Sequence, residues 1–175
     1  MPTAQSFILE SLQALHREWV EAVAGLASQQ VHRHHGGSTN TMAFVLWHYA
    51  RTQDNLVQFI FQGRKPTIWM DGGWDQRFQL DPRAQGTGFS SESASAVRID
   101  DLSAFGEYTA AVFRATEAYA ENLSDQELAR TVTVRPLGEL TIQEAIRKSV
   151  LTHGYSHLGE LWVLRGLEGL QGAGF

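Results

Sequence analysis

Four long segments of this 175-residue chain carry apolar side chains at three- and four-residue spacing, the pattern of an α-helix with one buried face. The expected helices span residues 3 to about 28, about 40 to 63, about 101 to 122 and 141 to 166. A helix with a single apolar stripe must bury that stripe against other elements. Because most of the connections are short, the pattern predicts an all-α fold, a four-helix bundle that forms a single domain over residues 1–175.

Capping residues indicate where these helices begin. One of residues 38–40, Ser-Thr-Asn, can cap the second helix, and Asp100 or Asp101 can cap the third. Residues 141–144, Thr-Ile-Gln-Glu, form a capping box at the start of the fourth. His16 falls among the polar positions of the first helix. The apolar face of the second helix carries Phe44, Val45, Leu56 and Phe59.

Two stretches depart from the helical pattern. Residues 64 to about 98 are rich in glycine and aromatic residues, which predicts a long irregular connection between helices two and three. Its aromatic side chains indicate that it packs down, either as a hydrophobic cluster beneath a loop or as a wall of a substrate pocket. Residues 131–134 alternate threonine and valine, so we expect a strand there, with residues 137–140 as its hairpin partner.

Composition excludes several classes of function. The net charge is −5 and the basic residues do not cluster, which argues against a nucleic-acid groove. The longest apolar run, residues 42–47, is too short to cross a membrane. The absence of cysteine excludes disulfides, thiolate ligands and a cysteine nucleophile. The sequence also begins without a basic segment followed by an apolar run, so we expect a cytoplasmic protein.

Two histidines, His153 and His157, lie four residues apart in the fourth segment. On a helix they project from the same face, where both imidazoles can reach one metal ion at roughly 2.0–2.1 Å. At 3.6 residues per turn both fall, with Glu160, on the stripe that faces the core. Buried polar groups need partners, and a metal ion is a partner that suits all three. The apolar members of this stripe are Ile142, Ile146, Val150, Leu161 and Leu164.

A third histidine, His48, lies in the apolar face of the second helix. A lone histidine in such a place is usually a core residue, but the interior of a bundle can bring it to His153 and His157. Three imidazoles would bind a divalent ion such as zinc, nickel or iron and leave a position for water or substrate. Glu160 and Asn55 are candidates for an outer hydrogen bond or a proton transfer. A helix-end carboxylate and an interhelical hydrogen bond are their plain alternatives.

The sequence lacks the motifs of two better-known helical metal sites. A zincin protease needs glutamate directly after the first histidine of the pair, where this chain has Gly154. A di-iron carboxylate bundle needs Glu-x-x-His motifs, and the chain has none. The histidines at 32, 34 and 35 lie in a glycine-rich stretch, where solvated side chains are the usual state.

The pattern of these motifs resembles the DinB-like superfamily, metal-binding four-helix bundles of bacterial origin. The resemblance rests on Leu46–Asn55 (LWHYARTQDN), Gly73–Phe78 (GWDQRF), His153–Leu161 (HGYSHLGEL) and Leu164–Leu167 (LRGL). It implies an up-down-down-up bundle, a three-histidine metal site and, frequently, a homodimer. The superfamily includes S-transferases that use bacillithiol or glutathione and the mycothiol-dependent maleylpyruvate isomerase. Despite its name, the family does not imply DNA binding.

The resemblance therefore implies a metal-dependent enzyme that transfers a thiol to a small electrophile or isomerises a thiol adduct. His48, His153 and His157 would bind the metal, with Glu160 and Asn55 as the catalytic candidates. Arg51 could hold a substrate carboxylate or pair with a neighbouring acid. A non-catalytic metal-binding bundle with a role in stress response is the alternative function, and metal-free core histidines are a third interpretation.

Overall fold

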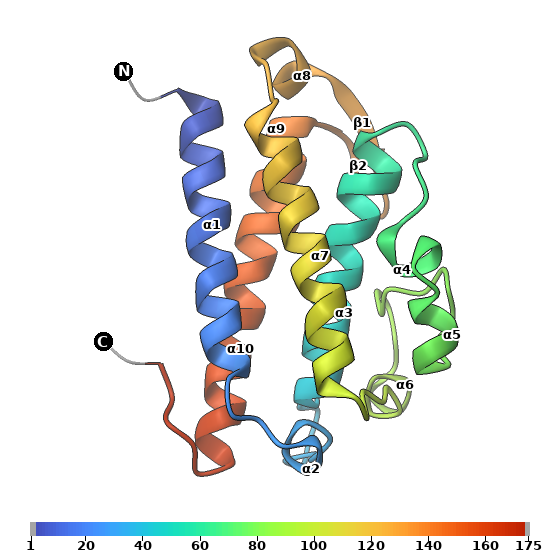
Figure 1. The fold of residues 1–175 in the computed structure, drawn as a ribbon, viewed down its shortest axis with the longest axis vertical. Helices are drawn as coiled ribbons and strands as arrows, with labels where there is room; N and C mark the ends of the chain where they lie inside the picture. The colour runs from blue at the N-terminus through green and yellow to red at the C-terminus, as the bar shows by residue number, and fades with distance from the viewer. Residues whose placement is uncertain (1–2, 174–175) are drawn as a thin grey trace.

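The computed structural model describes residues 3–173 of the chain. Four long helical rods stand side by side, and two of them contain a π-helical stretch (Figure 1). The rods are α1 (Ala4–Val23), α3 with η1 (Met42–Asp54 and Asn55–Phe61), α7 (Leu102–Glu121), and α9, η2 and α10 in succession (Ile142–Ala145, Ile146–Thr152 and His153–Leu167).

The rods form the predicted up-down-down-up bundle. In Figure 1, α1 and α10 run in one direction, whereas α3 and α7 run in the other. α1 packs against α7 and α10, and α3 packs against the same two helices. Each rod therefore buries its apolar stripe against two neighbours, and the all-α prediction is confirmed.

Two predicted boundaries were wrong. The first helix ends at Val23 instead of near residue 28, because Gly25 adopts a left-handed backbone conformation with φ of 73°. A separate short helix, α2 (Ser28–Val31), follows it. The second helix is capped by Thr41, whose side chain accepts a hydrogen bond from the amide of Phe44 (3.2 Å), and not by a residue from 38–40.

The other predicted starts are confirmed. Asp101 caps α7 through the amide of Ala104 (2.9 Å), and the box at 141–144 caps α9. After the short helix α8 (Asp125–Ala129), strands β1 (Thr131–Val134) and β2 (Gly138–Thr141) form the antiparallel hairpin. The second strand begins one position later than predicted, since residue 137 lies in the turn. The hairpin packs against η1 and α9.

The connection between η1 and α7 is fastened to the bundle. It contains three short helices, α4 (Ile68–Asp71), α5 (Trp74–Phe78) and α6 (Ser91–Ser95), beside α3 in Figure 1. Its aromatic residues pack down as the sequence indicated: the indole of Trp69 is fully buried and lies edge-on to the ring of Tyr108.

A buried ion pair on α3 holds this connection in place. The carboxylate of Asp54 accepts hydrogen bonds from the amides of Ile68 and Trp69, both at 2.9 Å. The guanidinium of Arg51 contacts Asp54 at 3.2 Å and donates to the carbonyls of Pro82 (3.0 Å) and Ala84 (3.3 Å). Arg51 is therefore engaged with a neighbouring acid, one of the two roles that the sequence left open for it.

Gly154 lets α10 approach its neighbours closely. A Cβ atom at this position would lie 2.6 Å from Leu15 Cδ2 and 2.7 Å from the hydroxyl of Tyr49. We expect Gly154→Ala to lower the free energy of unfolding by about 1–3 kcal/mol, because the packed side chains must shift. Gly159→Ala is the control, since a Cβ there meets no atom within 4 Å. Equal midpoints for the two variants in urea denaturation would contradict the expectation.

Within residues 3–173, no helix is long and apolar enough to cross a bilayer.

Candidate metal centre

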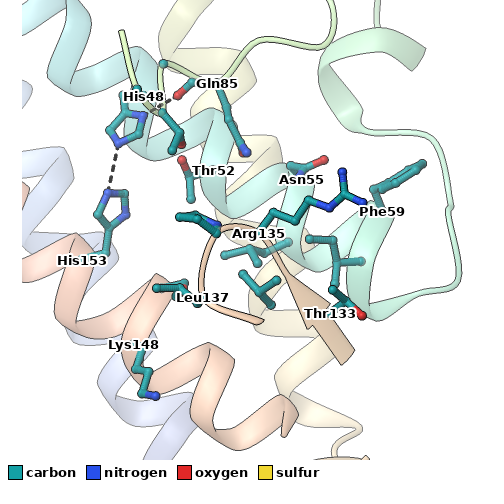
Figure 2. Close-up of a pocket in the computed structure, with 18 of the residues that line it drawn as sticks. His48, Thr52, Asn55, Phe59, Gln85, Thr133, Arg135, Leu137, Lys148 and His153 are labelled. Carbon is teal, nitrogen blue, oxygen red and sulfur yellow. Dashed lines mark hydrogen bonds between the residues drawn. The ribbon is translucent and has the colours of Figure 1, made fainter. Parts of the chain in front are cut away.

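The three histidines predicted from the sequence meet between α3 and α10. His48 projects from α3, and His153 and His157 project from α10. The Nε2 atoms of His48 and His153 lie 3.1 Å apart (Figure 2), and one ring nitrogen of each of the three residues lies within 4.8 Å of the others. The rings stand nearly perpendicular to one another. The structure thus brings together all three side chains in a group that could hold a metal ion.

The donor set fits a divalent metal. Two nitrogen ligands of a tetrahedral ion with bonds of 2.0–2.1 Å lie about 3.3 Å from each other, close to the observed Nε2–Nε2 separation. Imidazole is neutral and suits zinc, nickel and iron. In the part of the chain that the structure describes, no fourth histidine, aspartate or glutamate joins the group.

Outer hydrogen bonds orient two of the rings. The Nδ1 atom of His48 donates to the main-chain carbonyl of Gln85. The Nδ1 atom of His157 donates to Glu160 at 2.8 Å, and the other oxygen of Glu160 accepts from the amide of Asn40, also at 2.8 Å. Because a neutral imidazole that donates through Nδ1 keeps its lone pair on Nε2, both rings present Nε2 as a ligand atom.

The carbonyl of Gln85 reaches His48 because the next residue is a glycine. Gly86 has a φ of 86°, a conformation that side chains rarely adopt. A Cβ atom there would lie 2.8 Å from the ring of Phe44 and 3.1 Å from His48 Nδ1. The connection therefore approaches α3 closely enough for its main chain to bind a histidine.

The protonation states favour metal binding at neutral pH. Burial, assisted by the neighbouring His157 and His48, lowers the pKa of His153 to about 4. Burial also lowers the pKa of His48. For Glu160, burial acts to raise the pKa, but the hydrogen bonds from His157 and Asn40 outweigh it and hold the pKa below its usual value. A metal ion requires neutral imidazole ligands with free lone pairs, and an ionised outer carboxylate strengthens the ligand that it orients.

The two π-helical stretches border this site. η2 ends at Thr152, directly before His153, and η1 begins at Asn55, on the same rod as His48. π-helical turns are rare and occur frequently at functional sites. They shift the side chains that follow relative to a regular helix, so they determine which residues face the histidines.

Two of the three histidines, His48 and His153, lie at one end of a cleft of about 850 Å³. Its walls come from α3 and η1, the loop at 85–88, the hairpin and η2. Asn55 lies in this wall, beside Arg135 and Phe59 in Figure 2, and forms no side-chain hydrogen bond to the three histidines. Glu160 contacts His157 and is not among the residues of the cleft wall. Of the two catalytic candidates, Asn55 therefore lies in the cleft wall and Glu160 lies behind His157, outside the cleft wall.

The other histidine group is engaged in protein contacts. His32 accepts from the amide of Ile99 at 2.9 Å through Nε2 and contacts the carbonyl of Ser28 at 2.7 Å through Nδ1. His35 lies 3.0 Å from the carboxylate of Glu168. Within residues 3–173 these histidines do not form a group that could hold a metal ion.

Sequence reasoning missed two contributors to the site. The acceptor for His48 is a main-chain carbonyl, which has no sequence signature. Asn40 is one of the three candidate caps in the sequence, whereas in the structure its side-chain amide donates to Glu160. The one available signal was the position of Asn40, two residues before the helix that carries His48.

We expect Glu160→Gln to weaken metal binding roughly 10- to 100-fold, the usual cost of losing an outer hydrogen-bond partner. A glutamine offers one acceptor oxygen where Glu160 serves two donors, His157 and Asn40. Competition with a chromogenic chelator measures the affinity. Glu107→Gln, at an exposed position of α7, is the control, and equal affinities in the two variants would contradict this role.

Comparisons with known proteins agree with the fold. A family model described as the DinB superfamily matches residues 11–161. The crystal structure of a conserved protein from Enterococcus faecalis has a TM-score of 0.80 and 18% sequence identity, with 95% of this chain and 98% of that chain covered, a likeness that shows the fold. No protein with curated annotation matches. Because the family model spans most of the sequence, the chain belongs to the DinB superfamily.

Proposed function

We propose that this protein is a metal-dependent enzyme that uses a small thiol, either as an S-transferase or as an isomerase of a thiol adduct. The observation that carries the proposal is a group of three histidines, two of which (His48 and His153) line the end of a cleft, without a fourth protein ligand in the described part of the chain. Structural metal sites are usually closed by four protein ligands, whereas catalytic sites keep a position for water or substrate.

The chemistry follows from the residues at the site. His48, His153 and His157 would hold the ion, which when bound supplies a Lewis acid that lowers the pKa of a thiol from its ordinary value of about 8.5. The chain has no cysteine, so the sulfur nucleophile has to come from a cosubstrate. In a transfer the thiol would give its proton to water in the cleft, an S–C bond would form, and the bond between carbon and the leaving group would break so that the leaving group departs with its electron pair.

Other residues have supporting roles in this proposal. Gln85 and Glu160 keep the rings of His48 and His157 in their ligand orientation. Glu160, held ionised by its two hydrogen bonds, would hold the Nδ1 proton of His157 and so keep the Nε2 lone pair of that ring for the ion. Asn55 offers its amide to a substrate from the cleft wall.

The test begins with protein purified without a histidine tag. Its metal content is measured by elemental analysis, and the metal-loaded protein is then assayed with glutathione, bacillithiol and mycothiol against 1-chloro-2,4-dinitrobenzene. We expect stoichiometric metal and thiol conjugation that disappears in His157→Ala and persists in His34→Ala. Stoichiometric metal without affinity for any of these thiols would reject thiol chemistry and favour metal-assisted hydrolysis, whereas a fourth protein ligand on the bound metal would favour a non-catalytic metal-binding bundle.

A further inference from the structure

We propose that the cleft beside the three histidines takes a small molecule that carries an anionic group such as a carboxylate. The inference deepens the proposed function, on which it rests for the place of the reaction, by naming the substrate class. It is carried by the charges of the cleft wall, by unpartnered hydroxyl groups near the histidines, and by the position of one arginine.

The cleft wall is basic in an acidic protein. Its charged residues are Arg64, Arg135 and Lys148, and its lining includes no aspartate or glutamate. The whole chain has 19 acidic residues and 14 lysines and arginines, so this bias runs against the composition. A cleft lined by one sign of charge attracts ligands of the opposite sign.

Of the three basic residues, the two arginines are the better candidates for binding an anion. Among residues 3–173, the ion pairs of arginine side chains involve other positions, so Arg64 and Arg135 are without a carboxylate partner there. Lys148 also lies near Glu144 on its own rod: the hydrogen bonds from Thr141 lower the pKa of that carboxyl most, and the charge of Lys148 adds to them. An arginine without a carboxylate partner beside a cleft is available to bind an oxyanion through paired N–H groups.

Near the histidines, the cleft wall also carries neutral hydrogen-bond donors that could bind an anionic ligand. The hydroxyls of Thr52 and Ser149 are shielded from solvent and have no hydrogen-bond partner within the described chain. Thr52 lies one turn after His48, and Ser149 lies one turn before His153. A shielded hydroxyl without a partner is unfavourable, and rotation about χ1 can turn it toward a ligand oxygen. Gln85, whose Oε1 atom is also unpartnered, adds one acceptor to the same wall.

Arg135 and the histidines lie at different ends of the cleft, so an anionic group and a reacting group of one ligand could bind at different places. In Figure 2, Arg135 extends from the hairpin turn across the cleft toward Asn55 and Phe59, away from His48 and His153. The side chain of Phe59 is 44% exposed and can cover the hydrocarbon part of a ligand. A molecule with its carboxylate at Arg135 would therefore direct its other end toward the histidines.

The first experiment compares succinate with its neutral diamide, succinamide, by calorimetric titration of the metal-free and the zinc-loaded protein. We expect succinate to bind roughly tenfold or more tightly than succinamide in both forms, since a charge-assisted hydrogen bond contributes about that factor. Arg135→Gln should remove most of this difference. Arg147→Gln makes the same charge change on η2 outside the cleft wall and should leave it intact. Equal affinities for the two probes, equal effects of the two variants, or no saturable binding in the millimolar range would overturn the inference.

A second pair of probes distinguishes the two possible sources of the anionic group. The zinc-loaded protein is titrated with 3-mercaptopropionate and with 3-mercaptopropionamide. A preference for the acid places the carboxylate on the thiol, whereas discrimination between succinate and succinamide alone places it on the electrophile. If succinate is preferred but no thiol is used, only the proposed reaction fails. If neutral thiols are used and no probe shows a charge preference, only the anionic subsite fails.

Discussion

Replacing His48 with alanine is expected to abolish tight metal binding while the bundle stays folded. His48 is the single member of the group from α3, so its loss leaves two imidazoles one turn apart on α10. The affinity should fall by more than about 100-fold, because even the loss of an outer hydrogen-bond partner costs about 10- to 100-fold. Elemental analysis after dialysis and chelator competition measure the change.

The fold should tolerate this substitution because the ring of His48 lies at the edge of the cleft. It is partly buried and stacks on Phe44, with ring centroids 5.3 Å apart. His34→Ala is the matched control, since His34 is an exposed histidine of the loop before α3. A His48→Ala protein with the helical circular dichroism of the wild type and full metal content would show that the proposed ligand set is wrong.

The three- and four-residue spacing of apolar side chains was sufficient to predict the helical bundle. The stripe of the fourth rod is buried as expected at Ile142, Val150 and Leu161, and both of its histidines are half-buried and lie beside His48. The pair of histidines on α10 that belongs to the candidate metal group was predictable for the same reason. A polar residue that recurs within a buried stripe must have a partner, and the spacing of His153 and His157 leaves few other partners than a metal ion.

The helical spacing failed at one residue of the π-helical stretch η1. Phe59 was expected on the buried face of the second helix, yet its side chain is 44% exposed and borders the cleft. It lies in the π-helical stretch η1, whose wider turns rotate the residues relative to a 3.6-residue period. No residue type signals this change, so a single sequence does not predict which side chains line the cleft.

The sequence also did not predict contacts between segments that lie far apart in the chain. His16 was expected at a polar position of the first helix, but it is 4% exposed, stacks on Phe113 and contacts Glu117 at 2.5 Å. The carbonyl of Gln85 reaches His48 only because a connection that follows the second rod folds back on it. Such contacts join segments far apart in the chain, and local spacing carries no information about them.

The largest loss of stability is expected for Asp54→Ala. Both side chains of the pair that Asp54 forms with Arg51 are almost fully buried, and the carboxylate also accepts from the hydroxyl of Tyr108 at 3.1 Å. Removing the carboxylate leaves the charge of Arg51 buried without its partner, together with the amides of Ile68 and Trp69. Breaking a buried ion pair on one side costs about 3–5 kcal/mol, a large part of the roughly 5–15 kcal/mol that stabilises a domain.

Urea denaturation of the metal-free protein measures this loss. Asp100→Ala is the control, because the pair of Asp100 with Arg98 is solvent-exposed and an exposed ion pair contributes about 1 kcal/mol or less. If Asp54→Ala does not fold, Asp54→Asn keeps one acceptor oxygen and separates the charge from the hydrogen bonds. Equal unfolding free energies for Asp54→Asn and Asp100→Ala would contradict the role of the buried pair.

Asp54 also connects stability to metal binding. Its partner Arg51 binds the carbonyls of Pro82 and Ala84, and the next residue, Gln85, supplies the carbonyl that orients His48. A connection loosened at Asp54 therefore loses its hold on the His48 ring. We expect folded Asp54→Asn to bind zinc up to about 10- to 100-fold more weakly than the wild type, the range for a lost outer partner. Wild-type zinc affinity in a destabilised Asp54→Asn protein would show that the connection does not position His48.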